Sequence, residues 1–338
     1  MSAPRLTVGI PTFNRAAWLG EAIESVLAQT FTDFRLIVSD NASDDDTPEV
    51  VRSFADERIE YVRSEHNVGS IGNCNRLVDL AETEFLVLLP DDDLLYPGHL
   101  QAAVEVLDRF EHVGLAHSAF DVIDMQSRVV ERVDLLGSRS PVTIERDGRA
   151  LERLMVAEWP MCFSSIVYRT EVLRAAGGFR AQEEPFCDFE LWMRIAAEWD
   201  FAYLGQQLAG FRVHDGSVTT KVIAEHDATR HEREVTLTHA AMRFQRRTSF
   251  LEQAALGPRR GAQLRALAEL QFALDRTRAG GARGEGAARA ARLATRFPRL
   301  LGRLDLWRLV LAPGGVRSLL RSLGSRLTPA AIRATHAG

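Results

Sequence analysis

Residues 5–40 read "RLTVGIPTFNRAAWLGEAIESVLAQTFTDFRLIVSD", and this stretch decides the fold. It begins and ends with short runs rich in Val, Ile and Leu, which are typical of strands covered on both faces. Between these runs, Trp18, Ile23 and Val26 recur at helical spacing. A strand, a helix and a second strand in this order predict one unit of a parallel sheet with a right-handed crossover.

The same alternation continues to about residue 112. Strands are predicted at "RIEYVRS" (58–64) and "EFLVLLP" (84–90), and helices at 44–55, 70–82 and 98–110. The helix at 44–55 has an acidic first turn and Pro48, both of which favour a helix start. We therefore expect an α/β fold with a mostly parallel, Rossmann-like sheet and helices on both faces.

Later residues follow a less regular pattern. Residues 113–124 and 127–136 predict two strands joined near Gln126 and Ser127, and later runs predict strands at 163–169 and 201–213. A helix is expected around "DFELWMRIAAEW" (188–199). We expect a catalytic domain at 1–225, with halves at about 1–112 and 113–225, followed by a helical, Arg-rich region at 226–338.

Composition narrows the class of protein. The chain has 338 residues, of which 46% are apolar and 26% are charged, as in ordinary soluble proteins. Its 3 cysteines are widely spaced, which argues against a disulfide scaffold or a zinc site. The first residues, "MSAPRLTVGIPTFN", lack the basic and apolar regions of a signal peptide. No uncharged apolar run approaches the ~18 residues needed to span a bilayer, so we expect a cytoplasmic protein.

Polar residues follow each of the first four predicted strands. They are 11–15 (Pro-Thr-Phe-Asn-Arg), 40–44 (Asp-Asn-Ala-Ser-Asp), 65–67 (Glu-His-Asn) and 91–93 (Asp-Asp-Asp). In an open parallel sheet these ends meet at one edge, where ligands bind. The edge lacks the G-x-G-x-x-G fingerprint and the G-x-x-x-x-G-K-[ST] loop, so a dinucleotide site and a P-loop are both disfavoured.

Three adjacent carboxylates, Asp91, Asp92 and Asp93, end the fourth strand. Taken alone, they fit a solvated turn, a helix cap or a cation site. Mg²⁺ or Mn²⁺ binds one or two carboxylates together with phosphate oxygens and water. Such a metal acts as a Lewis acid that neutralises charge on a departing diphosphate.

Several motifs in order carry a family resemblance: "TVGIPTFN" (7–14), "QT" (29–30), "DNASDDDT" (40–47), "NVGSIGNCN" (67–75) and "LLPDDDLLYP" (88–97). They resemble the family 2 inverting glycosyltransferases of GT-A fold, over residues 5 to about 220. The resemblance implies a nucleotide-diphosphate-sugar donor, with UDP or dTDP favoured, bound to a turn that meets base and ribose. The nucleotide-sugar residues it implies are Pro11, Thr12, Asn14, Asp40, Asn41, Asn67 and Asp91.

The second half contains two further matching segments. "FCDFELWMRIA" (186–196) is similar to the segment that supplies the family's catalytic base, here Asp188, with Cys187 in place of the usual Glu. "GFRVHDGSVT" (210–219) resembles the loop whose histidine, here His214, reaches the metal. The metal residues implied are Asp92, Asp93 and His214. The Asp-x-Asp pattern itself points to Asp91 and Asp93, whereas spacing from Pro97 favours Asp92, so the choice stays open.

The leading interpretation is a metal-dependent inverting glycosyltransferase that uses Mg²⁺ or Mn²⁺ and an acceptor with a free hydroxyl. Asp188 is its general base, with Glu190 as the next candidate. The alternative is a catalytically inactive sugar-nucleotide-binding or scaffold protein on the same fold. A nucleotidyltransferase would need an N-terminal Gly-rich phosphate loop, which the sequence lacks. The aromatic residues Trp159 and Phe163 and nearby Met161 fit the core better than an acceptor pocket.

The C-terminal region has an unusual charge. From residue 241 onward there are 19 Arg, no Lys and 5 acidic residues, a formal charge of +14, whereas the first 240 residues carry −19. This region fits a solvated helical bundle, a groove for an anionic acceptor, or a helix on an anionic membrane surface. We expect no nucleic-acid partner, because no recognition motif accompanies the charge.

Overall fold

The protein is described here by a computed structural model, which covers residues 3–137, 140–156, 161–184, 186–214 and 232–278. Its centre is a ten-stranded sheet in the order β3-β2-β1-β4-β9-β6-β10-β5, with β7 paired to β6 and β8 paired to β10. The strands are β1 (Leu6–Thr12), β2 (Phe34–Asp40), β3 (Ile59–Arg63), β4 (Phe85–Leu88), β5 (Leu94–Leu95), β6 (Val113–Ile123), β7 (Val129–Val133), β8 (Val142–Glu145), β9 (Val167–Arg169) and β10 (Asp200–Arg212).

The first four long strands form the parallel part of the sheet, as the sequence predicted. β2 pairs with β1 and β3, and β1 pairs with β4, all in parallel. Gly9 in β1 is needed for packing, since a Cβ atom there would lie 2.9 Å from a methyl group of Leu77 on the covering helix. The predicted alternation of strand and helix is therefore confirmed in this half.

The second half of the sheet is mixed. β10 pairs in parallel with β6, while β9 runs antiparallel to both β4 and β6. β6 and β7 form the predicted hairpin, whose turn includes Ser127 at φ 59°. β5 and β8 were missed. β5 has only two residues, and β8, although as long as β4, lacks a continuous apolar run such as residues 85–89.

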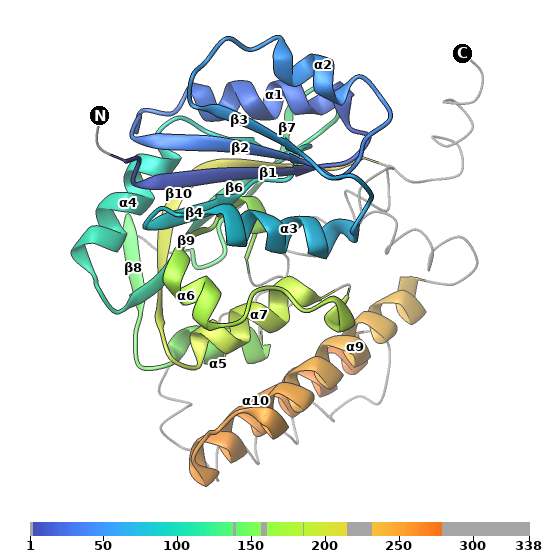
Figure 1. Cartoon of the computed structure of the whole chain (residues 1–338). Coiled ribbons are helices and arrows are strands. Elements are labelled where there is room, and N and C mark those ends of the chain that lie inside the picture. Colours follow the sequence, from blue (N-terminus) through green and yellow to red (C-terminus); the bar gives the residue numbers. More distant parts are fainter. Residues whose placement is uncertain (1–2, 138–139, 157–160, 185, 215–231, 279–338) are drawn as a thin grey trace.

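Helices cover both faces of the sheet (Figure 1). They are α1 (Ala16–Leu27), α2 (Thr47–Arg52), α3 (Gly69–Leu80), α4 (His99–Arg109), α5 (Arg149–Val156), α6 (Thr170–Ala175), α7 (Cys187–Ala196), α9 (Glu232–Gln253) and α10 (Pro258–Arg278). Helices α1 and α4 share one buried apolar cluster with β1 and β2. Helices α3, α5 and α7 share a second cluster on the other face, which also contains Met161. Phe163 packs against this cluster, whereas Trp159 lies outside the described residues.

Part of the Arg-rich region packs against helices α5 and α7. Leu264, Leu267 and Ala268 of α10 are buried in the same cluster as α5 and α7. Arg247 of α9 is fully buried; it donates a hydrogen bond to the Leu154 carbonyl (3.0 Å) and lies over the Phe189 ring. These two helices therefore continue the core. Of the three interpretations of the Arg-rich region, the membrane-surface helix concerns residues from about 286 onward, which lie outside the described residues.

Candidate functional site

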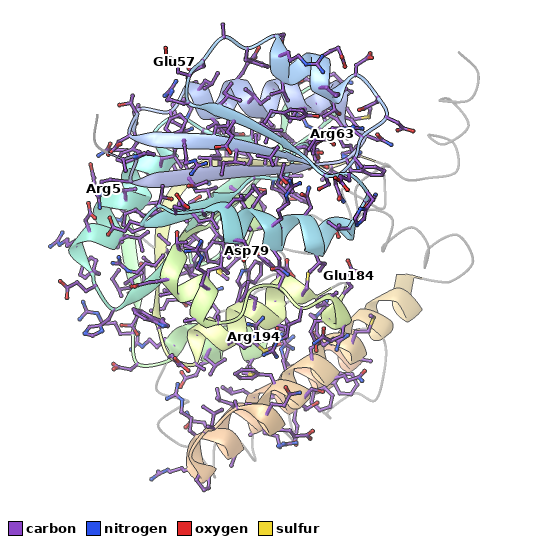
Figure 2. The ribbon with its side chains drawn as sticks, in the orientation of Figure 1. Arg5, Glu57, Arg63, Asp79, Glu184 and Arg194 are labelled. Carbon is purple, nitrogen blue, oxygen red and sulfur yellow. The ribbon has the colours of Figure 1, made fainter. Side chains whose placement is uncertain are left out.

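The carboxyl ends of the parallel strands bring the predicted polar residues to one edge. In register, Thr12 at the end of β1 lies opposite Asp40 at the end of β2, which lies opposite Arg63 at the end of β3. Figure 2 shows Arg63 on this side of the sheet and Arg5, at the start of β1, on the opposite side. The Asp91–Asp93 triplet follows β4, which is parallel to β1, and reaches the same edge.

Asp40 is fully buried, and its carboxylate already has protein partners. One oxygen accepts a hydrogen bond from the Ser43 N–H (2.8 Å), and the other accepts one from the Tyr61 hydroxyl (2.5 Å). The Arg63 Nε atom lies 3.3 Å from the second oxygen. Asp40 thus fixes the turn after β2, and its predicted contact with the nucleotide stays a prediction.

Asn41 and Asn67 are brought together across two loops. Asn41 Nδ2 donates to Asn67 Oδ1 (2.8 Å), while Asn41 Oδ1 accepts from the Val68 N–H (2.9 Å). Asn14, in the left-handed region at φ 54°, accepts from the Asp44 N–H through its side chain (2.9 Å). These amides tie the loops after β1 and β2 to the start of α3. A nucleotide at this edge would meet a pre-arranged surface.

The three carboxylates of the triplet have different surroundings. Asp93 is 2% exposed, and both of its oxygens accept hydrogen bonds, one from the Ser164 hydroxyl and one from the Arg212 N–H (2.8 Å). Burial and the charge of Asp92 raise the pKa of Asp93 well above its usual value. The same two causes raise the pKa of Asp91 to about 7. Both oxygens of Asp93 thus have protein donors, which fix the loop, and its role as a metal ligand stays a prediction.

Asp92 lies beside His214, the other residue for which the sequence predicts metal binding. Asp92 Oδ2 lies 2.9 Å from His214 Nε2, although the two residues are 122 positions apart. Nη1 of Arg15, just before α1, lies 3.3 Å from the same histidine nitrogen and 3.9 Å from the same carboxylate oxygen. The Trp18 ring packs against the His214 ring with centroids 4.2 Å apart. A carboxylate oxygen and an imidazole nitrogen thus converge beside a guanidinium.

The side chain of Arg212 links the loop of Asp92 to neighbouring elements by hydrogen bonds. Its side chain is fully buried and donates from Nε to the Asp92 carbonyl (2.7 Å) and from Nη2 to Glu21 of α1 (2.9 Å). Its Nη1 donates to the Asp124 carbonyl (3.1 Å) and the Ser127 hydroxyl (3.0 Å) in the β6–β7 turn. A buried guanidinium is stable only when its donors are matched, so this residue ties α1, the triplet and the turn to the strand that leads to His214.

Asp188 lies at the start of α7 and is partly exposed. Its Oδ1 accepts a hydrogen bond from the Phe189 N–H (2.6 Å). Burial raises the pKa of Asp188 to about 6, against the opposing effect of backbone N–H groups. Glu190, the other predicted candidate for the base, pairs with Arg194 (2.8 Å) and Arg180 (3.2 Å). The geometry therefore leaves Asp188 as the carboxylate better able to accept a proton.

Residues 7–166 match the model of the family described as Glycosyl transferase family 2. Over these residues the chain carries the domain of this glycosyltransferase family. The GalNAc(5)-diNAcBac-PP-undecaprenol beta-1,3-glucosyltransferase of Campylobacter jejuni is 42% identical over 105 residues, 30% of this chain and 34% of that protein. An uncharacterized glycosyltransferase of Rickettsia typhi is 23% identical over 228 residues, 65% of this chain and 68% of that protein.

Solved glycosyltransferases share the GT-A fold of this chain. TarS of S. aureus, solved with UDP-GlcNAc, superposes with a TM-score of 0.58 at 17% identity, covering 86% of this chain and 81% of that chain. The mannosyltransferase PcManGT of Pyrobaculum calidifontis, solved with GDP-Man and Mn²⁺, gives 0.56 at 19% identity, covering 92% and 86%. At such identities the likeness establishes the fold, and the chemistry must come from this chain's own residues.

Several residues of this glycosyltransferase's site were not predicted from sequence. Arg15 and Trp18 were noted only as parts of a motif and a helix, and Arg212, Glu21 and Ser164 were not considered. Of these residues, only Arg212 could have been identified from the sequence. It is a charged residue inside the otherwise apolar strand "LAGFRV" (208–213), which indicates a buried partner. No set of three His, Cys, Asp or Glu side chains gathers as a metal site among the described residues.

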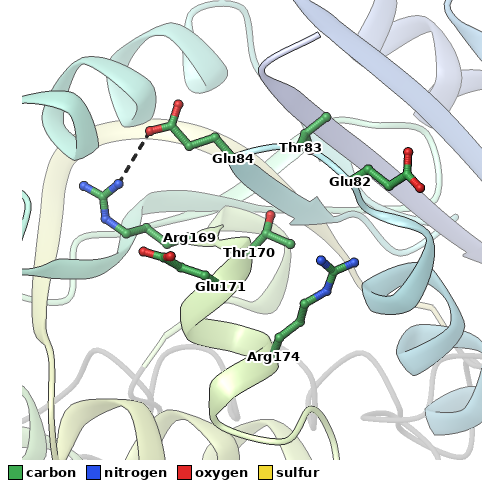
Figure 3. A pocket seen from close by; sticks show the side chains of 7 residues that line it. All are labelled: Glu82, Thr83, Glu84, Arg169, Thr170, Glu171 and Arg174. Carbon is green, nitrogen blue, oxygen red and sulfur yellow. Dashed lines mark ion pairs between the residues drawn. The ribbon is translucent and has the colours of Figure 1, made fainter. Parts of the chain in front are cut away.

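A separate hollow of about 590 Å³ lies elsewhere on the enzyme (Figure 3). Its lining is Glu82, Thr83, Glu84, Arg169, Thr170, Glu171 and Arg174. It lies where β4 begins, whereas the candidate site lies beyond the end of that strand. Arg169 is 3.8 Å from Glu84, and Arg174 donates hydrogen bonds to carbonyls at the end of α3. Both arginines thus have partners within the protein and stabilise the fold.

Within the described residues, none of the helices has the length and apolarity to cross a bilayer.

Proposed function

We propose that this glycosyltransferase transfers a sugar from a nucleotide-diphosphate-sugar to an acceptor hydroxyl with inversion at the anomeric carbon. In this proposal Asp92 and His214 bind the divalent metal, and Asp188 is the general base. Asp91, Asn41 and Asn67 belong to the donor site, together with Pro11, Thr12, Asn14 and Asp40. The catalytic domain would span 1–225, with α9 and α10 bracing its acceptor half.

One observation carries the proposal, namely the pairing of Asp92 Oδ2 with His214 Nε2 at 2.9 Å. A carboxylate oxygen suits both Mn²⁺ and Mg²⁺, which complete their shells with water and phosphate oxygens, and an imidazole nitrogen favours Mn²⁺ over Mg²⁺. Two protein ligands therefore fit such a metal without a third protein ligand. PcManGT, solved with GDP-Man and Mn²⁺, supports the metal class. When bound, the metal would supply positive charge for the departing diphosphate.

The protein groups have separate tasks in the reaction. Asp188 would accept the proton of the acceptor hydroxyl as the new bond forms, on the face opposite the departing nucleotide. Because its pKa is about 6, it is mostly ionised at neutral pH and still a stronger base than an ordinary Asp. Asn41 and Asn67 would orient the nucleotide through the loop network described above.

The nucleotide remains open between UDP, dTDP and GDP. TarS was solved with UDP-GlcNAc and PcManGT with GDP-Man, so relatives in fold use different bases. Our prediction from sequence favours UDP or dTDP. The rival function, an inactive sugar-nucleotide-binding protein, is disfavoured because the base candidate and the metal pair are both present in the chain.

A ligand panel tests the proposal. Melting temperature is measured with UDP, dTDP and GDP and their sugar derivatives, each with and without Mn²⁺. A ligand that binds the native state stabilises it in proportion to ln(1 + [L]/Kd). We expect one nucleotide to stabilise the protein in Mn²⁺, and its sugar derivative to be hydrolysed slowly or transferred to a hydroxyl acceptor. Stabilisation without any turnover of the sugar would favour the inactive binding protein.

A further inference from the structure

Arg15 occupies an unexpected position in the candidate site. Its Nη1 lies 3.3 Å from His214 Nε2 and 3.9 Å from Asp92 Oδ2, the two atoms assigned to the metal. The guanidinium also lies over the Trp18 ring, 5.5 Å from its centroid, and this ring packs against His214. A permanent cation is therefore fixed beside the proposed metal ligands.

This placement creates a conflict of charge. A guanidinium has five N–H donors and no lone pair, so it cannot coordinate a metal. It can only compete with a metal, because like charges a few ångströms apart repel strongly where burial lowers the effective dielectric constant. Only 21% of the Arg15 side chain and 15% of the Asp92 side chain are exposed, so water screens this repulsion incompletely.

A diphosphate resolves the conflict. Its oxygens can accept hydrogen bonds from a guanidinium, often two at a time, while other oxygens bind the metal. Its negative charge would offset the repulsion between Arg15 and a metal held by Asp92 and His214. The Arg15 carbonyl accepts hydrogen bonds from the Trp18 and Leu19 N–H groups of α1 (3.1 and 3.2 Å), so the helix holds its backbone and the exchange is assigned to its side chain.

Resting on the function proposed above, we propose that Arg15 holds the metal's place in the free enzyme and becomes a ligand of the donor's diphosphate. Metal and nucleotide then bind as a mutually dependent pair, and the free enzyme takes up the metal only weakly. The arginine keeps Asp92 and His214 together until the donor arrives.

Substitution of Arg15 should have opposite effects on the two ligands. In Arg15→Met, Mn²⁺ alone should bind at least ~10-fold more tightly, because the competing charge is gone. UDP or GDP in saturating Mn²⁺ should bind at least ~10-fold more weakly, because charge-assisted hydrogen bonds are lost. Arg15→Lys keeps the charge without the planar fork, so it should bind Mn²⁺ as weakly as wild type and recover only part of the nucleotide affinity.

Arg58→Met is the matched control. Arg58 also pairs with a carboxylate, that of Asp56 (2.7 Å), and lies over an aromatic ring, that of Phe34 (4.4 Å). It precedes β3 and so belongs to the edge opposite the site. Free Mn²⁺ is followed by electron paramagnetic resonance and nucleotide binding by calorimetry, with melting temperature recorded for each variant. The control should leave both affinities unchanged.

The outcomes separate this inference from the function on which it rests. If Arg15→Met binds Mn²⁺ and nucleotide both more weakly and to the same extent, or with unchanged affinities, the proposed exchange of Arg15 between metal site and diphosphate is overturned. A wild-type enzyme that binds nucleotide equally well without Mn²⁺ and loses it in Arg15→Met would also overturn it, since the arginine would then replace the metal altogether. A wild-type protein that binds no nucleotide in any condition would refute the proposed function itself.

Discussion

The substitution Asp188→Asn separates the chemistry of the proposed base from its place in the fold. Asparagine preserves the shape of the side chain and can still accept the Phe189 N–H bond that Asp188 makes at 2.6 Å. It cannot take a proton from the acceptor. We therefore expect transfer to fall by ~10²-fold or more while donor binding stays close to wild type. Such a loss corresponds to at least about 2.7 kcal/mol of transition-state stabilisation.

The pH dependence supplies a second signature. Because the pKa of Asp188 is raised to about 6, kcat/KM of the wild type should rise about tenfold per pH unit below 6 and level off above it. Asp188→Asn should lack this inflection.

The free energy of unfolding should fall with rising pH over the range in which kcat/KM rises. A carboxyl whose pKa is higher in the folded state binds more protons there, so folded-state stability falls as pH rises from about 3.8 to about 6. The cost at neutral pH is at most about 3 kcal/mol, and partial exposure makes it smaller. Asp188→Asn avoids this cost, so its melting temperature should match or exceed that of wild type at pH 7.

Three measurements together test whether Asp188 is the base. They are initial rates of nucleotide release, donor affinity by calorimetry, and melting temperature. Glu190→Gln is the control, because Glu190 pairs with Arg194 and Arg180 and should lose stability without losing the pH inflection. Wild-type turnover in Asp188→Asn would refute the assignment. A selective loss of kcat in Glu190→Gln at unchanged melting temperature would move the base to that residue.

Three further predictions follow from the site and the tail. Asp92→Asn and His214→Ala should each weaken Mn²⁺-dependent nucleotide binding in calorimetry, whereas Asp93→Asn, whose two oxygens face protein donors, should mainly lower the melting temperature. Arg212→Met should lower both melting temperature and nucleotide affinity, whereas Arg153→Met, which breaks the buried pair with Glu145 (2.7 Å), should lower melting temperature alone. A chain ending at residue 284 should still bind sugar nucleotide but stop co-sedimenting with anionic vesicles, and wild-type sedimentation should fade as salt rises; full-length protein that ignores vesicles at low salt would contradict a membrane role.

Much of the fold could be predicted because its signals are local. Apart from β5, the strands and helices up to residue 110 follow hydrophobic periodicity, and parallel pairing follows from their alternation. The convergence of 11–15, 40–44 and 91–93 at one edge is then a consequence of topology. The mixed half was less accessible, because β5 has only two residues and β8 lacks a continuous apolar run, so both are defined by pairing with β10.

The roles within the Asp triplet could not be predicted, because distant residues decide them. Asp93 is turned into the protein by Ser164, 71 residues away, and by the backbone of Arg212, 119 residues away. Asp92 is instead drawn to His214. Three identical neighbours carry no local difference from which these partners could be inferred, so sequence spacing left the metal ligand undecided.

The part of the chain that matches the family model does not contain the whole candidate site. Residues 7–166 contain the strand ends, Arg15 and Asp92, yet Asp188, Arg212 and His214 all lie beyond them. β10 brings the last two back to the triplet by pairing with β6 and β5. Because Arg212 bonds to the Asp92 carbonyl and to Glu21 of α1, docking of this strand also fixes the helix that follows Arg15. Asp92 and His214 can therefore come together only when β10 is paired in the sheet, so we expect variants that loosen β10 to lose Mn²⁺-dependent nucleotide binding.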